Sequence, residues 1–551
     1  MGLDLSDSLN KHVLLVDDFA NVRKSIKSMI TSIGLRNVFE AAHGNEATRI
    51  VREQKLDIVM CDYNLEKGKN GSQLLEEWRK RGWLSHETIF VMITAETSRD
   101  RVMGTLEFQP DDYLAKPFAM DTLKQRLVRW MDRQEELRPV NAALDKGDWA
   151  QVAKMCRDLI KNKSRYRSWA QRKYHQALLK LDRLEDATKF LGIVLKEREY
   201  PWARLEVHRI QVARKELQKA EKGLRTLINK EPNLIDAYDL LAQVQNMLKQ
   251  PEHVQHTLEQ ALERSPLSIP RQRSLAKVAT GNGDLATATR AYKEVVNLCE
   301  GTMHDAPDVY KDALRATRTR MALETNEAQR RRLRLDAMTY LKKLMKNFPD
   351  DTDADLVSRA YRSFLNDPQD TRARADGFIK ELAQKASRKM EELSQDSAVD
   401  IAEIIYEKGE NELADELIDK LRDYHRSSKA FLERLNQVQT EPTTTVETRE
   451  KAHQMNIQGI EHYKKKRYTE AVGQFEEALE LSPRHPGIIL NLVQSSLLEV
   501  GTGSPTKQRL DQCVELVKRL SYLPRDHYQY DRYLTIRSKL NDLTDGAVIA
   551  Q

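Results

Sequence analysis

The sequence predicts two architectures in one chain: an α/β domain with a doubly wound parallel sheet, followed by a long all-α superhelix of stacked helix pairs. Short aliphatic runs alternate with helix-period segments over residues 9–132, which is typical of βα units. Helical periodicity then continues to the C-terminal region. Within it Pro232 and Pro266 are 34 residues apart, a spacing that indicates repeated helix pairs.

Bulk composition narrows the class of protein. The 551 residues are 40% hydrophobic and 32% charged, with only 21 Gly and 16 Pro, a helix-rich balance with room for several domains. No run approaches the roughly 20 apolar residues that cross a bilayer, and the acidic N-terminus does not resemble a signal peptide. We therefore expect a cytoplasmic protein without a membrane segment. The four cysteines are too scattered for a metal site or a disulfide framework.

The alternation over residues 9–132 can be read element by element. Buried strands of a parallel sheet are continuous aliphatic runs, whereas the helices between them have apolar residues three or four positions apart. The predicted strands are 11–16, 38–41, 56–61, 88–93 and 113–115, and the predicted helices are 23–32, 45–53 and 73–81.

Polar side chains follow four of these strands where each strand ends. Asp17 and Asp18 follow the first, Asp62 the third, Thr94 the fourth and Lys116 the fifth. Because the carboxyl ends of parallel strands share one edge, these side chains should converge. Three carboxylates can stay ionised together around a hard divalent cation such as Mg²⁺. The set predicts phosphoryl transfer to Asp62 as nucleophile, with the Lys116 ammonium and the Thr94 hydroxyl on the phosphoryl oxygens.

The segments VDD, D62 after an aliphatic strand, TA and AKPF together resemble the CheY-like receiver domain of bacterial two-component response regulators. The resemblance covers about residues 9–132 and implies a flavodoxin-like fold of strand order 2-1-3-4-5. It also implies that a histidine kinase phosphorylates Asp62, and that Asp17, Asp18, Asp62 and the backbone carbonyl of Asn64 hold Mg²⁺. One departure is the loop after Asp62, which lacks the proline common in the family and carries extra polar residues.

The same resemblance assigns further roles. Thr94 and Tyr113 would form the switch that follows phosphorylation, although ordinary packing of Tyr113 at the sheet edge is an alternative. Asn64 and Glu96 occupy the positions that tune dephosphorylation, with the pair found in the chemotaxis single-domain receiver, which resets quickly. The resemblance thus implies a short-lived phosphoryl group on Asp62.

The clearest repeat in the remainder covers about residues 452–484 and resembles the tetratricopeptide (TPR) pattern. Small residues would let two helices approach, and Phe475 would fill the gap between repeats. The marks are Gly459, Tyr468, Ala471, Phe475, Ala478 and Pro483. We expect TPR-like repeats over 133–300, a degenerate helical region over 301–436, a linker or break over 437–450 and C-terminal TPR repeats over 451–545.

Receivers fused to TPR arrays resemble the VieB-like group, which implies a signalling adaptor and no enzyme beyond the receiver's own phosphotransfer and dephosphorylation. The implied partners are a histidine kinase and a protein target of the array, with a cyclic-di-GMP enzyme or another response regulator as candidates. A constitutive TPR scaffold and a nucleic-acid-binding regulator are the alternatives. The second would use the arginines between Arg315 and Arg334, but no aromatic residues interleave with them, so a solvated helix face paired with acids is favoured.

Overall fold

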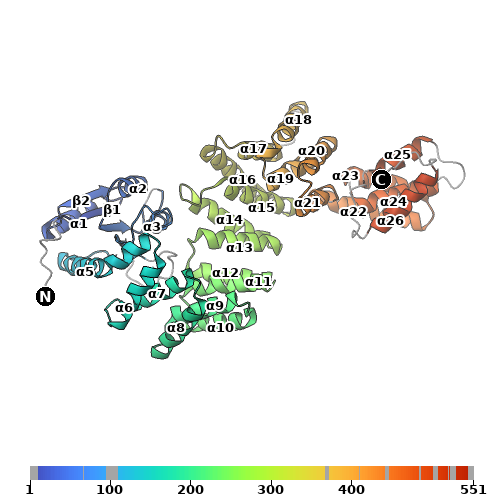
Figure 1. Ribbon diagram of the computed structural model, residues 1–551. Helices are drawn as coiled ribbons and strands as arrows, with labels where there is room; N and C mark the ends of the chain where they lie inside the picture. The colour runs from blue at the N-terminus through green and yellow to red at the C-terminus, as the bar shows by residue number, and fades with distance from the viewer. Residues whose placement is uncertain are drawn as a thin grey trace. The chain divides into compact units, whose positions relative to one another are not determined.

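The computed structural model describes residues 10–65, 68–94, 110–324, 326–365, 372–408, 410–440, 446–482, 485–499, 507–518, 520 and 529–543. The chain forms two compact units, Met1–Asp305 and Ala306–Gln551. The first unit contains a parallel sheet and a series of helix pairs, and the described part of the second is helical (Figure 1).

The sheet has five parallel strands in the order β2-β1-β3-β4-β5, which confirms the α/β fold and the implied strand order. The three central strands are buried almost throughout, as a sheet covered on both faces requires. The strands are β1 (His12–Val16), β2 (Asn37–Ala41), β3 (Ile58–Asp62), β4 (Ile89–Thr94) and β5 (Asp112–Ala115).

Helices cover both faces of this sheet. Alternate strand residues point to opposite faces, so Val13 and Leu15 pack with α1 (Ala20–Ile33) and α5 (Met120–Asp145). Their neighbours Leu14 and Val16 pack on the other face with α2 (Gly44–Glu53) and α3 (Gly71–Lys80). Two separate hydrophobic cores therefore fix the strands from both sides, and with them the residues at the strand ends.

Helix α5 belongs to two substructures. Near its start Leu123 and Leu127 lie in the sheet core, whereas near its end Val140 and Leu144 pack in the first core of the helical array. The helix runs for 26 residues and contains Pro139. The expected boundary at residue 132 thus lies inside a continuous helix.

After α5, the described residues of the first unit form a series of helices of similar length. They are α6 (Trp149–Lys161), α7 (Arg167–Lys180), α8 (Leu184–Glu197), α9 (Pro201–Ala213), α10 (Leu217–Lys230), α11 (Ile235–Met247), α12 (Pro251–Arg264), α13 (Ile269–Gly281) and α14 (Leu285–Cys299).

Backbone turns show the repeat more clearly than side chains do. Residues with positive φ, 33 to 35 positions apart, end alternate helices: Gly147, Asp182, Lys215, Lys249 and Gly283. Lys163 is a further one, between α6 and α7. At each the next residue's amide bonds back five positions, as from Gln250 N to Gln245 O at 3.0 Å, the pattern of a Schellman motif. The array therefore has a period of about 34 residues.

The second unit continues in helices. These are α15 (Pro307–Leu323), α16 (Glu327–Asn347), α17 (Thr352–Leu365), α18 (Arg372–Arg388), the short η2 (Met390–Glu392), α19 (Gln395–Glu407), α20 (Asn411–Tyr424), α21 (Lys429–Thr440), α22 (Val446–Lys464), α23 (Tyr468–Leu481), α24 (Pro486–Glu499), α25 (Lys507–Lys518) and α26 (Tyr530–Leu543). Within the break expected over 437–450, α21 extends to Thr440 and α22 begins at Val446, and residues 441–445 lie outside the described residues.

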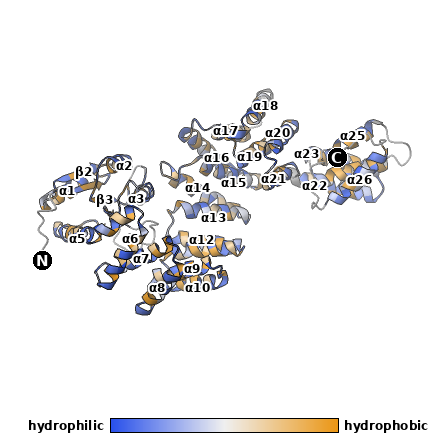
Figure 2. Cartoon of the chain, in the orientation of Figure 1, coloured by the Kyte–Doolittle hydropathy of each residue, from blue (hydrophilic) through white to orange (hydrophobic). Residues whose placement is uncertain are grey.

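Hydrophilic residues occur on helices throughout both units (Figure 2). Among the described helices, none has the length and apolar character needed to cross a membrane.

Two arginines of the basic stretch in α15, the partly buried Arg315 and the buried Arg318, form ion pairs. Arg315 Nη2 lies 2.7 Å from Asp400 Oδ2, and Arg318, only 3% exposed, pairs with Glu403. Both acids belong to α19. Burial of a charge is tolerated only when it is paired, so Arg318 is a structural residue between α15 and α19 and its guanidinium is enclosed, while that of Arg315 is already paired with Asp400.

Contacts of Gly459 test the packing of the C-terminal repeat. A Cβ atom at Gly459 in α22 would lie 2.6 Å from Phe475 Cε1, and Phe475 is 1% exposed and cannot move aside. We expect Gly459→Ala to destabilise this repeat by about 1–3 kcal/mol, measured as faster amide hydrogen exchange in α22 and α23. Gly473→Ala is the matched control, since nothing lies within 4 Å of its Cβ position; it should stabilise α23 by about 0.5–1 kcal/mol. Equal effects of the two substitutions would contradict this packing.

Candidate functional site

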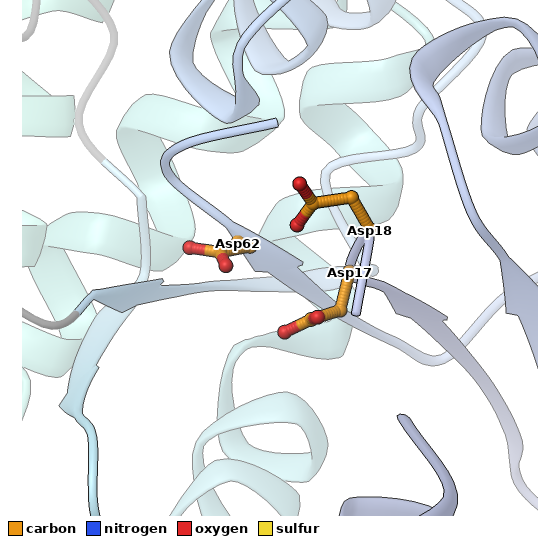
Figure 3. A group of neighbouring side chains, drawn as sticks. All are labelled: Asp17, Asp18 and Asp62. Carbon is orange, nitrogen blue, oxygen red and sulfur yellow. The ribbon is translucent and has the colours of Figure 1, made fainter. Parts of the chain in front are cut away.

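Three carboxylates converge at the ends of β1 and β3 (Figure 3). The register pairs Val16 with Cys61, so the next residues, Asp17 and Asp62, leave the sheet side by side. With Asp18 they each offer one oxygen within 4.8 Å of the others. Asp17 is fully buried and Asp62 is 7% exposed.

Lys116 reaches the same place from the end of β5. Its Nζ donates to Asp17 Oδ2 at 2.6 Å and to Asp62 Oδ2 at 2.7 Å. Its backbone amide donates to the Thr94 carbonyl at 2.7 Å, which ties the end of β5 to the end of β4. The carboxyl ends of β1, β3, β4 and β5, where the sequence predicts the site residues, therefore meet at one edge of the sheet.

Burial sets the protonation behaviour of this group. It raises the pKa of Asp62, although the hydrogen bond and charge of Lys116 act in the opposite direction. Burial alone would lower the pKa of Lys116, but hydrogen bonds to Asp17 and Asp62 outweigh it and raise that pKa. Burial also raises the pKa of the Cys61 thiol, so this neighbour stays protonated and is a poor nucleophile.

The donor set fits a magnesium ion. Three carboxylates face one ammonium, which leaves two negative charges in excess when all are ionised. Mg²⁺ is a hard divalent cation that prefers carboxylate oxygens and keeps positions for water or phosphate. Asp17, Asp18 and Asp62 are thus the residues that would hold it.

The remaining expected residues lie around this centre. Thr94 is buried at the end of β4 and pairs with Ala115, the residue before Lys116. Tyr113 is half-buried in β5 and packs against the core on the α2 and α3 side. The backbone N–H of Asn64 donates to Asp62 Oδ1 at 3.3 Å. Glu96, like Pro483 of the C-terminal repeat, lies outside the described residues.

One contact of this site, between Gly71 and the Asp62 backbone, was not predicted from the sequence. A Cβ atom at Gly71, the first residue of α3, would lie 2.4 Å from the Asp62 carbonyl oxygen and 2.9 Å from Met92 Sδ. No larger residue fits there without displacing backbone. The signal in the sequence is Asn70-Gly71, a helix cap followed by the smallest residue.

Comparison with known proteins agrees with this geometry. The family model described as response regulator receiver domain matches residues 13–128. The chemotaxis protein CheY-3 of Vibrio cholerae is 32% identical over 124 residues, which are 22% of this chain and 94% of that protein. The chemotaxis protein CheY of Pseudomonas aeruginosa is 31% identical over 121 residues, 22% of this chain and 96% of that protein.

A solved receiver domain of a sensor histidine kinase from Pseudomonas aeruginosa, with magnesium in its active site cleft, is 28% identical. The match covers 22% of this chain and 98% of that one, with a TM-score of 0.20.

The fold and the acidic site define a signalling protein of the two-component class. Through its N-terminal domain the chain belongs to the response-regulator receiver family.

Charge substitutions should shift the Mg²⁺ affinity of the full chain in opposite directions. Asp18→Asn removes a ligand charge and should weaken Mg²⁺ binding about 10-fold. Lys116→Gln removes an ammonium that competes for Asp17 and Asp62, and should strengthen binding. Isothermal titration calorimetry measures both. Asp57→Asn, at the opposite end of β3, is the control and should leave the affinity unchanged. A shift of the same sign in Asp18→Asn and Lys116→Gln would rule out this site.

Proposed function

We propose that the chain is a cytoplasmic response regulator whose output is protein binding. A histidine kinase phosphorylates Asp62 in the presence of Mg²⁺, and the helical array binds a partner signalling protein. The observation that carries this proposal is the convergence of Asp17, Asp18 and Asp62 with Lys116, which bonds to two of them at 2.6 and 2.7 Å.

The proposed transfer is a single displacement at phosphorus. An Asp62 oxygen attacks the phosphorus of a phosphohistidine as the P–N bond breaks, and the electron pair stays on the imidazole nitrogen. Lys116 moves its hydrogen bonds from carboxylate to phosphoryl oxygens, and the Thr94 hydroxyl donates to another. Mg²⁺, when bound by Asp17 and Asp18, neutralises the equatorial charge. Thr94 and Tyr113 would then change position together as the switch.

The array supports a binding output. Its 34-residue backbone period agrees with the length of a TPR unit, and stacked helix pairs of this kind present extended binding surfaces. The VieB-like resemblance makes a cyclic-di-GMP enzyme or another response regulator the candidate target. Pairing of Arg315 with Asp400 and burial of Arg318 beside Glu403 weigh against the nucleic-acid alternative.

Phosphorylation of Asp62 can be tested on the purified chain. Incubation with acetyl phosphate and Mg²⁺ should add one phosphoryl group, located at Asp62 by mass spectrometry after borohydride reduction. Asp62→Asn should not be labelled, because the amide is a poor nucleophile. Asp57→Asn should be labelled like the wild type, since Asp57 bonds to Lys11 far from the site. Labelling of Asp62→Asn to the wild-type extent would contradict the proposal.

Partner binding separates a switch from a constitutive scaffold. Affinity capture with wild type and Asp62→Ala, each with and without phosphodonor, should give partner sets or affinities that depend on the donor only for the wild type. Identical capture in all four samples would support the scaffold.

The lifetime of the phosphoryl group is a further expectation. Asn64 is exposed beside Asp62, and with Glu96 it should leave the hydrolytic water access to the phosphoryl group. We expect fast loss of label after donor removal, and slower loss in Asn64→Lys, whose longer side chain obstructs that water. Loss rates come from quenched samples. Wild-type label that outlasts the variant's would disprove this assignment.

A further inference from the structure

Helix α3 is packed directly on the backbone of the proposed phosphoacceptor. Its first residue, Gly71, leaves no room for a Cβ atom against the Asp62 carbonyl oxygen. The Gly71 amide also donates to the Tyr63 carbonyl at 3.0 Å. A shift of the segment at Asp62 must therefore move the start of α3, because close-packed backbone has no slack to absorb it.

Gln73 connects this segment to the helical array. Its Oε1 accepts a hydrogen bond from the backbone N–H of Asn70 at 3.0 Å, and its own backbone N–H donates to Asn70 Oδ1 at 2.9 Å. This pair of bonds is a capping box, which starts the helix. Its Nε2 donates to the carbonyl of Leu298 in α14 at 3.2 Å. The Gln73 side chain thus bonds both to Asn70, which caps α3, and to Leu298 of the array.

Glu76, one turn further along α3, makes a second contact with the array. Its Oε1 lies 3.2 Å from His304 Nε2 and 2.6 Å from Lys80 Nζ. Burial would raise the pKa of Glu76, but hydrogen bonds to His304 and Lys80 lower it overall. The carboxylate is therefore ionised and accepts hydrogen bonds from Lys80 Nζ and His304 Nε2.

The two surfaces meet around a small gap. It encloses about 40 Å³ between Tyr63, Asn70 and neighbouring α3 residues on one side and Leu267–Pro270 and His304 on the other. Tyr63 directly follows Asp62, so this interface begins one residue from the proposed phosphoacceptor.

The array is also joined to the sheet domain through α5, which is continuous across both. That joint is a continuous helix, whereas the contacts of α3 with the array include the polar bonds of Gln73 and Glu76. A local change at Asp62 reaches the α3 contacts directly, because α3 begins against the Asp62 backbone.

We propose that α3 is the element through which the array senses phosphorylation of Asp62. The contacts of Gln73 with Leu298 and of Glu76 with His304, here called the α3 clasp, are closed in the unphosphorylated chain and open when Asp62 carries a phosphoryl group. This inference rests on the proposed function and deepens it. It assigns the signal path to α3, in addition to the switch expected at Thr94 and Tyr113.

The physical reason is steric and electrostatic. A phosphoryl group adds three oxygens next to Asn64, whose backbone amide bonds to the Asp62 carboxylate that the group would modify. Displacement of Asp62 and Tyr63 moves Gly71 at the start of α3, and Gln73 then cannot keep both its capping bonds and its bond to Leu298. Opening exposes the array surface around Leu267–Pro270 to a partner.

Linkage gives a direct test with beryllofluoride, a phosphoryl analogue that binds aspartate with Mg²⁺. If modification of Asp62 opens the clasp, a substitution that favours the open clasp must also tighten beryllofluoride binding, because the two equilibria are coupled reciprocally. We expect His304→Ala to tighten it about 5-fold, the lower end of usual coupling, measured by calorimetry on the Mg²⁺-loaded full chain. Glu76→Gln should act similarly, and the double variant should bind no tighter than either single one.

Lys27→Gln is the matched control, because it breaks a 2.5 Å ion pair with Glu40 on the α1 side of the domain and should not change binding. Hydrogen exchange gives a second readout: beryllofluoride should accelerate exchange of the Gln73 amide and of amides over 298–304 in the wild type. Failure of the wild type to bind beryllofluoride would count against the proposed function itself. Binding by the wild type that is unchanged or weakened in both clasp variants would overturn the α3 clasp alone.

Discussion

Repulsion among three carboxylates is the constraint on which the rest of the sheet domain depends. Asp17, Asp18 and Asp62 are kept within 4.8 Å of one another because two hydrophobic cores fix the strands that end in them. Lys116 compensates one charge and leaves two. A site that cannot relax by moving its carboxylates apart favours a divalent cation, and so favours chemistry on an anionic phosphoryl group.

The second feature is the absence of a flexible linker between the sheet domain and the array in the described residues. Many two-domain chains are joined by mobile segments, and their domains move independently. Here α5 is a structural element of both parts, and α3 contacts the array a short distance from Asp62. The continuous helix α5 keeps the two parts connected, while the polar contacts of α3 with the array can break. A small local change at Asp62 can then become a change of contact, as in other two-state switches.

The helical region from residue 306 onward is held partly by buried charge. Arg315 and Arg318 pair with Asp400 and Glu403 across α15 and α19, and burial raises the pKa of the neighbouring Tyr361. Small and aromatic residues such as Ala313 and Tyr310 are buried in the same region, so the ion pairs lie beside an apolar core. The same arginines, read as a basic patch from sequence, are structural in the folded chain.

The sequence by itself determined the order of strands and helices, and the residues at the strand ends that meet at one sheet edge. Periodicity and strand-end chemistry are local properties, and the βα topology then leaves few choices for Asp17, Asp62 and Lys116. Only the tertiary structure decided which surfaces meet. Glu76 and His304 are 228 residues apart, and no periodic pattern encodes a contact at that distance. The close approach of Gly71 to Asp62 likewise depends on how α3 packs against β3, since a glycine at the start of a helix can serve other structural purposes.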